Sequence, residues 1–366
     1  HRIDALKARI AHGASYRQSL ADQRRAVTHR VFAETVGEPQ VIRAAKSLAA
    51  FLREKEIVMV PGDVLAGFQQ CYDFDMPLDL PCFDARPADS VLSKDNLPLA
   101  LAGGVSGDDV ALMEEFLTGL EIGVASTCLG GHVIAGYDRV LATGFSKLAA
   151  EARAETGAFA EASAIVMDAA CDYAWRYAQR AMELLADAPA EDRPYLRRIA
   201  EACEELSEGP ARSFAQAVQA VALTHEILTA EQPCSSLSLG RVDQYLHPYY
   251  MADIAAGALT EEDARELIEA LWLKIGALVQ SYQNVTLGGA DGEGASQANA
   301  LTAMGLAATA RLAMDQPLVS LRCHAGMSDE LWDATLGLIE QGMGFPALFN
   351  DPVVMEAKER VGIAPE

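Results

Sequence analysis

Short uncharged runs alternate with longer amphipathic segments after Pro210, and this pattern limits the possible folds most strongly. Each run is too short for a helix and ends in glycine or a polar residue, which is typical of strands. Thr260, followed by acidic residues at 261–263, predicts the N-terminal cap of one intervening helix. The alternation favours an α/β architecture, either a barrel or an open parallel sheet. We expect strands at 236–239, 284–287, 318–321 and 346–349, and helices at 249–256, 261–279, 297–312 and 329–341.

The first 209 residues are predicted to be mainly helical. Ile3, Leu6 and Ile10 recur at helical spacing, and an apolar helical face repeats over residues 41–52. The strand-like piece at 57–60 is the exception, and it runs into a turn.

An alanine-rich amphipathic run over residues 145–185 predicts a long helix with one break near Gly157. Tyr173 and Trp175 on this run could suggest a stacking platform. On a helix of this length we instead expect both to be packing residues.

The net charge of −23 is unfavourable for binding nucleic acid phosphates or anionic membranes, so neither is an expected partner. No unbroken apolar stretch approaches the roughly 18 residues that a membrane span needs. The first residues carry no apolar signal core. These features predict a cytoplasmic protein.

Cysteine spacing and the absence of common motifs exclude several chemistries. The seven cysteines form no CxxC pair, which argues against a disulfide framework and against a metal site, so no metal is expected. The sequence has no GxGxxG after a strand and no GxxxxGK[ST], so no nucleotide cofactor is expected. It also lacks HExxH and GxSxG. Hydrolase, kinase and metalloenzyme functions are therefore disfavoured.

Several sequence blocks together resemble the pyruvate formate-lyase-like domain of glycyl radical enzymes. The most specific is SLGRVDQYLHPYY, which ends at Tyr250, and the similarity extends over nearly the whole chain. The other blocks are GEP at 37–39, GHVIAGYDRVL at 131–141, PARSF at 210–214, QNVTLGG at 283–289, SLRCH at 320–324 and GFPALFND at 344–351.

This resemblance implies a ten-stranded β/α barrel of two five-stranded halves, surrounded by many helices, with the active site inside. The chain would be the N-terminal portion of that domain, mainly helical over 1–209 and with barrel strands and helices over 210–366. The resemblance also implies a homodimer and a small-molecule substrate. A glycyl radical, installed by an S-adenosylmethionine-dependent radical activating enzyme, would generate a thiyl radical that removes a substrate hydrogen atom. A dry cavity would protect that radical.

The Gly-Cys-x-Glu finger loop and the glycyl radical domain of the family are absent from this sequence. No catalytic residue is therefore expected in this chain, and the radical cysteine, the glutamate and the radical glycine are expected beyond Glu366. The fragment alone would be inactive. Either the protein continues, or the remaining residues are on another chain, or this is a non-catalytic half-barrel subunit. The uncharged strand runs favour a missing partner half, since an adapted remnant would blunt its exposed edges.

The blocks are more similar to the branch that cleaves C–X bonds, which contains dehydratases and lyases, than to pyruvate formate-lyase. An acyltransferase like pyruvate formate-lyase is the alternative, and it would carry two adjacent cysteines on its finger loop. In diol dehydratases a His-Ser pair before the glycine-arginine step contacts substrate hydroxyls. This sequence has Ser235 and Ser236 there, which disfavours vicinal diols and leaves the substrate unnamed.

The resemblance suggests four substrate-binding residues: His132, Ser236, Tyr282 and Asn284. His132 would donate a hydrogen bond to a leaving group, or else cap local backbone. Ser236 would bind substrate from a strand, or else be a satisfied structural serine. Tyr282 and Asn284 begin a strand, and Tyr282 would form an aromatic wall beside the substrate or else pack in the core.

Other prominent residues are expected to be structural. Arg241 and Asp243 are predicted to form an ion pair at a strand end. Cys234 and Cys323 lie outside any Gly-Cys-x-Glu context, so neither is expected to carry the thiyl radical. Glycines at 240, 288 and 344 are expected in strand-end turns.

Overall fold

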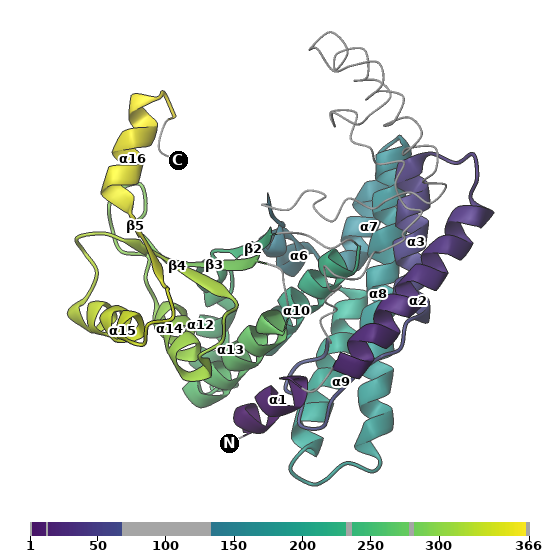
Figure 1. Ribbon diagram of the computed structural model, residues 1–366, viewed down its shortest axis with the longest axis horizontal. Coiled ribbons are helices and arrows are strands. Elements are labelled where there is room, and N and C mark those ends of the chain that lie inside the picture. Colours follow the sequence, from purple (N-terminus) through teal and green to yellow (C-terminus); the bar gives the residue numbers. More distant parts are fainter. Residues whose placement is uncertain (1, 12–13, 68–132, 232–235, 278–281, 364–366) are drawn as a thin grey trace, which may run out of the picture.

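The computed structural model describes residues 2–11, 14–67, 133–231, 236–277 and 282–363. A helical part and a sheet covered by helices lie side by side (Figure 1). The strands are β1 (Val133–Ile134), β2 (Ser236–Gly240), β3 (Tyr282–Gly288), β4 (Leu318–Cys323) and β5 (Ala347–Asn350). The helices are α1 (Arg2–Ala11), α2 (Ala14–Glu34), α3 (Gln40–Glu54), α6 (Tyr137–Thr143), α7 (Phe145–Ala154), α8 (Ala158–Leu185), α9 (Arg193–Glu208), α10 (Phe214–Glu231), α11 (Val242–Tyr245), α12 (His247–Ala256), α13 (Glu261–Gly276), α14 (Ala300–Leu312), α15 (Asp329–Glu340) and α16 (Asp351–Arg360).

The five strands form one parallel sheet in chain order, from β1 to β5. Parallel neighbours need a crossover connection, and helices α13, α14 and α15 provide it between successive strands. The predicted α/β architecture is confirmed. All four predicted strands and the four predicted helices between them are present, with ends that shift by a few residues within the described part of the chain.

One face of the sheet is covered by helices and contributes to the main hydrophobic core. Leu239, Val285, Leu287, Val319 and Leu321 are all buried there, against residues of α10, α13 and α14. These strand positions are odd-numbered, because successive side chains of a strand point to opposite faces. The even-numbered positions therefore point to the opposite face, which we call the open face; Figure 1 shows the covering helices on the other side.

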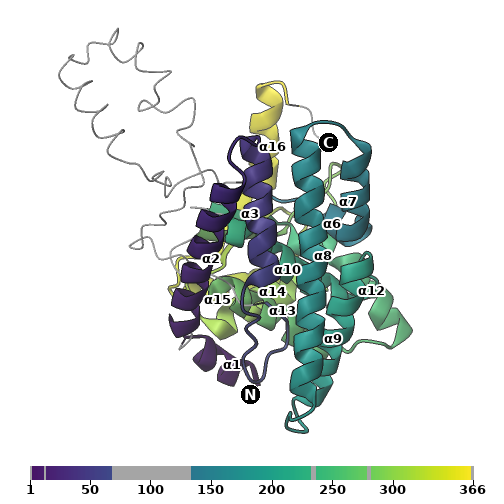
Figure 2. The ribbon, with the colours of Figure 1, turned by 90° about the vertical axis from the view of Figure 1, so that its right-hand side faces the viewer.

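The helical part is organised around α8. This helix contacts α3, α7 and α9, and the long helices α2, α3 and α8 run side by side in Figure 2. The predicted break is confirmed, since Gly157 with φ of 108° is the N-cap of α8. Tyr173 is buried, so its predicted packing role is confirmed. Trp175 is 42% exposed, so the same prediction is wrong for Trp175.

The strand predicted at 57–60 is wrong. These residues form no strand, although Val58 is buried against Leu20. The backbone N–H of Val60 donates to the Asp63 carboxylate at 2.8 Å instead of to a neighbouring strand. The apolar composition of residues 57–60 goes with the burial of Val58 and does not indicate pairing with a neighbouring strand.

Local turn chemistry agrees with the sequence at the helix and strand ends. Thr260 and Asp263 form a capping box at the start of α13. Gly240, Gly288 and Gly344 all have positive φ, as strand-end turns require. At Gly240 a Cβ would lie 2.8 Å from Ile134 Cγ2, so only glycine lets β1 approach β2 this closely.

Two buried ion pairs join the helical part to the helices that cover the sheet. Lys55, just after α3, binds Glu226 of α10 at 2.8 Å, and Lys274 of α13 binds Asp63 at 2.7 Å. The Gln219 side chain of α10 holds the backbone of residue 66 through both its N–H and its carbonyl. These contacts fix residues 63–67 against the core. Within the described part of the chain, none of the helices is long and apolar enough to span a membrane.

Candidate functional site

A row of polar side chains crosses the open face of the sheet. The Ser238 hydroxyl donates to the carbonyl of Asn284 at 3.1 Å, and the Asn284 amide donates to the Ser320 hydroxyl at 3.1 Å. Two residues earlier on β2 and β3, Ser236 lies opposite Tyr282. Three adjacent strands thus place hydroxyl and amide groups on one surface. We call these five residues the polar row.

The structure brings three of the four predicted site residues together. Ser236, Tyr282 and Asn284 share the open face because each occupies an even-numbered position of β2 or β3. Tyr282 is 63% exposed, so the alternative that it packs in the core is wrong. His132 lies outside the described residues, as does Cys234. The roles of all four residues in binding remain predictions.

Sequence reasoning missed Ser238 and Ser320, which complete the polar row. Both lie within strands that the sequence predicted correctly. A signal was available for Ser238 alone, because residues two apart in a strand point to the same face, whereas Ser320 lies on another strand. Applying that rule from Ser236 and Asn284 would have added Ser238 and Thr286 to the candidates.

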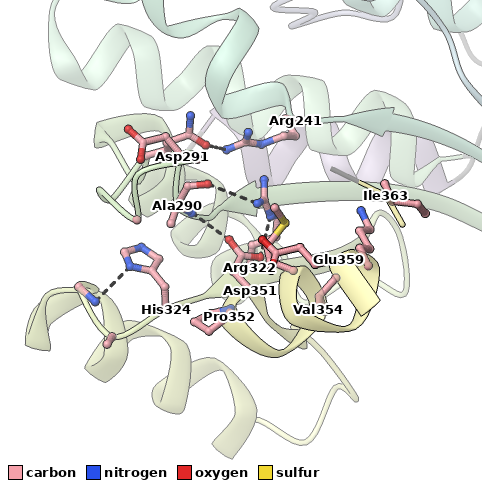
Figure 3. Close-up of a pocket in the computed structure, with 17 residues that line it drawn as sticks. Arg241, Ala290, Asp291, Arg322, His324, Asp351, Pro352, Val354, Glu359 and Ile363 are labelled. Atoms are coloured by element: carbon pink, nitrogen blue, oxygen red, sulfur yellow. Dashed lines mark hydrogen bonds and ion pairs between the residues drawn. The ribbon is translucent and has the colours of Figure 1, made fainter. Parts of the chain in front are cut away.

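An open cleft lies at the carboxyl ends of strands β2 to β5, where parallel α/β folds place their sites. Its volume is about 960 Å³. Figure 3 shows side chains from four successive strand ends and from α16 around it. The charged and polar residues that line it are Arg241, Asp291, Gln297, Arg322, His324, Asp351, Lys358 and Glu359.

An ion pair connects the last two strands at this cleft. Arg322 Nε lies 2.8 Å from Asp351 Oδ1, and Asp351 Oδ2 accepts the backbone N–H of Ala290 at 2.9 Å (Figure 3). Asp351 is almost fully buried. Both its oxygens are therefore engaged, and the carboxylate ties the loop after β3 to the end of β5.

The predicted ion pair between Arg241 and Asp243 is wrong, because both side chains bind the backbone of Gly288. Arg241 Nη2 donates to the Gly288 carbonyl at 2.8 Å and to Gln297 Oε1 at 2.7 Å. Asp243 Oδ2 accepts the Gly288 N–H at 2.7 Å and the Thr302 hydroxyl at 2.6 Å. Burial raises the pKa of Asp243, and these hydrogen bonds oppose that rise. Arg241 and Asp243 are therefore structural residues, as expected, but each holds the backbone of Gly288 and not the other side chain.

His324 and Cys323 point to opposite sides at the end of β4. His324 Nδ1 accepts the backbone N–H of Gly326 at 3.1 Å, so the proton of the neutral ring is on Nε2. His324 Nε2 is buried and has no hydrogen-bond partner among the described residues. Cys323 is buried in the core on the helix side, and burial raises the pKa of its thiol. Its position is that of a small hydrophobic residue.

The polar row and the cleft differ in the chemical groups that they present. The polar row offers neutral hydrogen-bond donors and acceptors, which suit hydroxyl groups. The cleft offers guanidinium groups and an imidazole N–H. Neither region, among the described residues, pairs a nucleophile with a general base.

Comparisons with known proteins place this chain in a family. A family model described as pyruvate formate lyase-like matches residues 109–366. The probable dehydratase YbiW of Escherichia coli strain K12 is 35% identical over 227 residues, covering 57% of this chain and 28% of that protein. An isethionate sulfite-lyase of Nitratidesulfovibrio vulgaris is 32% identical over 281 residues, covering 68% of this chain and 33% of that protein.

The fold also matches a solved structure. The crystal structure of a glycyl radical enzyme from Archaeoglobus fulgidus has a TM-score of 0.75 and 25% sequence identity to this chain. The match covers 98% of this chain and 53% of that one. The chain thus spans about a third of the length of the curated relatives and about half of the solved structure. The chain belongs to the pyruvate formate lyase-like family of glycyl radical enzymes.

Proposed function

We propose that this chain is the substrate-holding half of a glycyl radical enzyme that cleaves a C–X bond in a small polar molecule. The observation that carries the proposal is the polar row on the open face of a parallel sheet with the family fold. Its relatives are named as a dehydratase and a sulfite-lyase, which supports cleavage over acyl transfer.

In this proposal the residues of the chain bind and orient the substrate. Ser236 and Asn284 hydrogen-bond its hydroxyl or leaving group, and Tyr282 forms a wall beside it. Uncharged partners suit this role, because they hold the substrate through hydrogen bonds without placing a full charge beside it. A hydrogen atom leaves one substrate carbon, the leaving group departs from the neighbouring carbon, and the hydrogen atom then returns to the product.

The radical itself is proposed to be supplied by protein sequence other than residues 1–366. Residues 1–209 would form the helical support, and residues 210–366 would form one half of the barrel. We further propose that an S-adenosylmethionine-dependent radical enzyme activates the complete protein, which works as a cytoplasmic homodimer under anaerobic conditions.

Anaerobic activation of the complete protein tests the proposal. The natural full-length protein is produced with its activating enzyme, and a glycyl radical is sought by electron paramagnetic resonance. Deuterated candidate substrates, including isethionate, are then offered, and deuterium return to the product is followed by mass spectrometry. A radical signal with cleavage of a C–X bond supports the proposal. A radical signal accompanied by acyl transfer from pyruvate, or no radical in the activated protein, would overturn it.

A further inference from the structure

Trp175 and Met182 are large apolar side chains that α8 exposes on its outer surface, at 42% and 57%. They are seven residues apart, which is two helical turns or about 10 Å along the axis, so they lie on one face of the helix. The other side of α8 is filled by buried residues such as Tyr173 and Tyr177. Single exposed apolar residues are ordinary, but two on one face call for a common explanation.

An open groove of about 460 Å³ connects these two residues to α9. Its α8 side is lined by Trp175, Ala178 and Met182, and its α9 side by Ala200 and Glu204. Helices α8 and α9 are consecutive and packed together, joined by residues 186–192. The two alanines are small and almost fully buried, so they leave space between the larger side chains. A third helix can lie in such a groove between two packed helices.

The α9 side of the groove is acidic. Glu201, Glu204 and Glu208 are exposed and follow one another at spacings of three and four residues, so they form one stripe along α9. None of the three carboxylates forms an ion pair within the described part of the chain. Arg197, one turn before Glu201, offsets one of these charges. The stripe therefore keeps a net negative charge beside the apolar residues.

This charge limits what can occupy the groove. Glu183, on the α8 side, is already paired with Arg180 at 3.0 Å, so the stripe on α9 carries the unbalanced charge. A nucleic acid or an anionic membrane would be repelled. A second copy related by twofold symmetry would bring the same acidic stripe to the contact, where like charges oppose binding. Lysine and arginine side chains are the complementary groups.

We propose that the groove between α8 and α9 binds a short amphipathic helix of another protein, with lysine or arginine beside its apolar face. Apolar side chains three, four or seven positions apart pack on Trp175 and Met182, and the basic side chains reach Glu201 and Glu204. Tryptophan is frequent among the residues that dominate binding energy at interfaces. The groove shares no residue with the polar row or the cleft, so the inference goes beyond the proposed function and does not depend on it.

Fluorescence anisotropy on the complete, unactivated protein tests the groove. The probe is a labelled peptide of leucine, alanine and lysine, about five helical turns long, with leucine on one face and lysine beside it. A peptide of the same composition, reordered so that no face is apolar, is the control probe. At about 0.15 M salt we expect saturable binding of the amphipathic peptide, and binding about tenfold weaker or less for the reordered one.

Two substitutions in the groove separate its apolar and charged contributions. Trp175→Ser removes the aromatic anchor and Glu204→Lys reverses a charge, and each should weaken binding of the amphipathic peptide about tenfold or more. Phe159→Ser and Glu155→Lys are the matched controls. Both residues are exposed and lie near the start of α8, outside the groove, so their substitution should leave binding unchanged.

The docking site is refuted by the absence of saturable binding, by equal binding of the reordered peptide, or by undiminished binding in either groove variant. If Trp175→Ser instead separates a dimer into monomers, a second copy fills the groove and the proposal is likewise overturned. Shielding of Trp175 from acrylamide quenching in the complete protein would also overturn it. The titration needs no radical, so its failure leaves the proposed function untouched.

Discussion

Lys55 and Glu226 form an ion pair in the interior, with Nζ 2.8 Å from Oε1 and side chains that are 1% and 0% exposed. The hydroxyl of Tyr173 donates to the same oxygen at 2.6 Å. Burial lowers the pKa of Lys55, and the charge and hydrogen bond of Glu226 oppose that change. The pair links α3 to α10 across 171 positions of sequence, so each charge depends on a distant partner.

Removing one member of this pair should destabilise the fold strongly. Glu226→Gln leaves the Lys55 charge buried without its counter-charge, and we expect the free energy of unfolding to fall by roughly 3–5 kcal/mol. Urea denaturation followed by circular dichroism measures the change. The surface pair of Arg53 and Asp172, at 2.6 Å, is the control: Arg53→Gln should cost about 1 kcal/mol or less. Similar losses in the two variants would contradict the interpretation.

His225 should make the protein less stable in mild acid. Burial lowers the pKa of His225 to about 4, and its Nδ1 lies 2.7 Å from the Tyr137 hydroxyl. The unfolded chain therefore binds one more proton between about pH 6.5 and pH 4, so the free energy of unfolding falls as the pH falls. Over this window the natural protein should lose roughly 3 kcal/mol more than His225→Gln. Parallel pH dependences for the two proteins would refute this assignment.

Gly144 should tolerate no side chain. Its φ is 78°, and a Cβ would lie 2.5 Å from the backbone carbon of Gly209, so the junction of α6 and α7 could not pack against the end of α9 as it does. Gly257 is the matched control, with φ of 67° and nothing within 4 Å of a Cβ. Gly257→Ala should cost about 1–2 kcal/mol from backbone strain alone. Gly144→Ala should lower the midpoint of thermal unfolding by clearly more than Gly257→Ala does.

Asn284 should affect turnover more than stability. In the activated complete protein, Asn284→Ala removes a hydrogen-bonding group from the polar row and should reduce kcat/KM by roughly tenfold or more. Ser163→Ala removes a hydroxyl from the exposed face of α8, where it binds only the Phe159 carbonyl, and should leave kcat/KM unchanged. Equal activity of the Asn284 variant and the natural protein would remove this residue from the proposed site.

The sheet could be predicted from sequence because its signal is local. Each predicted strand is a short uncharged run between helical segments, and the parallel order follows from the connections. The two-residue strand β1 (Val133–Ile134) was missed, since two residues show no periodicity. Residues 57–60 gave the opposite error, because burial of Val58 does not require a neighbouring strand.

The ionic interior and the cleft could not be predicted, because their contacts join distant positions. Nothing near Lys55 in the sequence indicates Glu226, and nothing near Lys274 indicates Asp63. Arg241 was paired with Asp243 on proximity alone, whereas in the structure both bind the backbone of Gly288. A backbone group has no residue type, so a sequence pattern cannot reveal it as a partner.

Side chains alternate between the two faces along β2, β3 and β4, so substitutions in these strands affect either the core or the open face. Odd-numbered positions such as Val285 and Leu287 fill the core, whereas even-numbered positions such as Asn284 point away from it. Replacing Asn284 would therefore change the open face without opening a cavity among the helices. If the proposed function holds, the surface that meets the substrate can change at such positions while the core of the sheet stays intact.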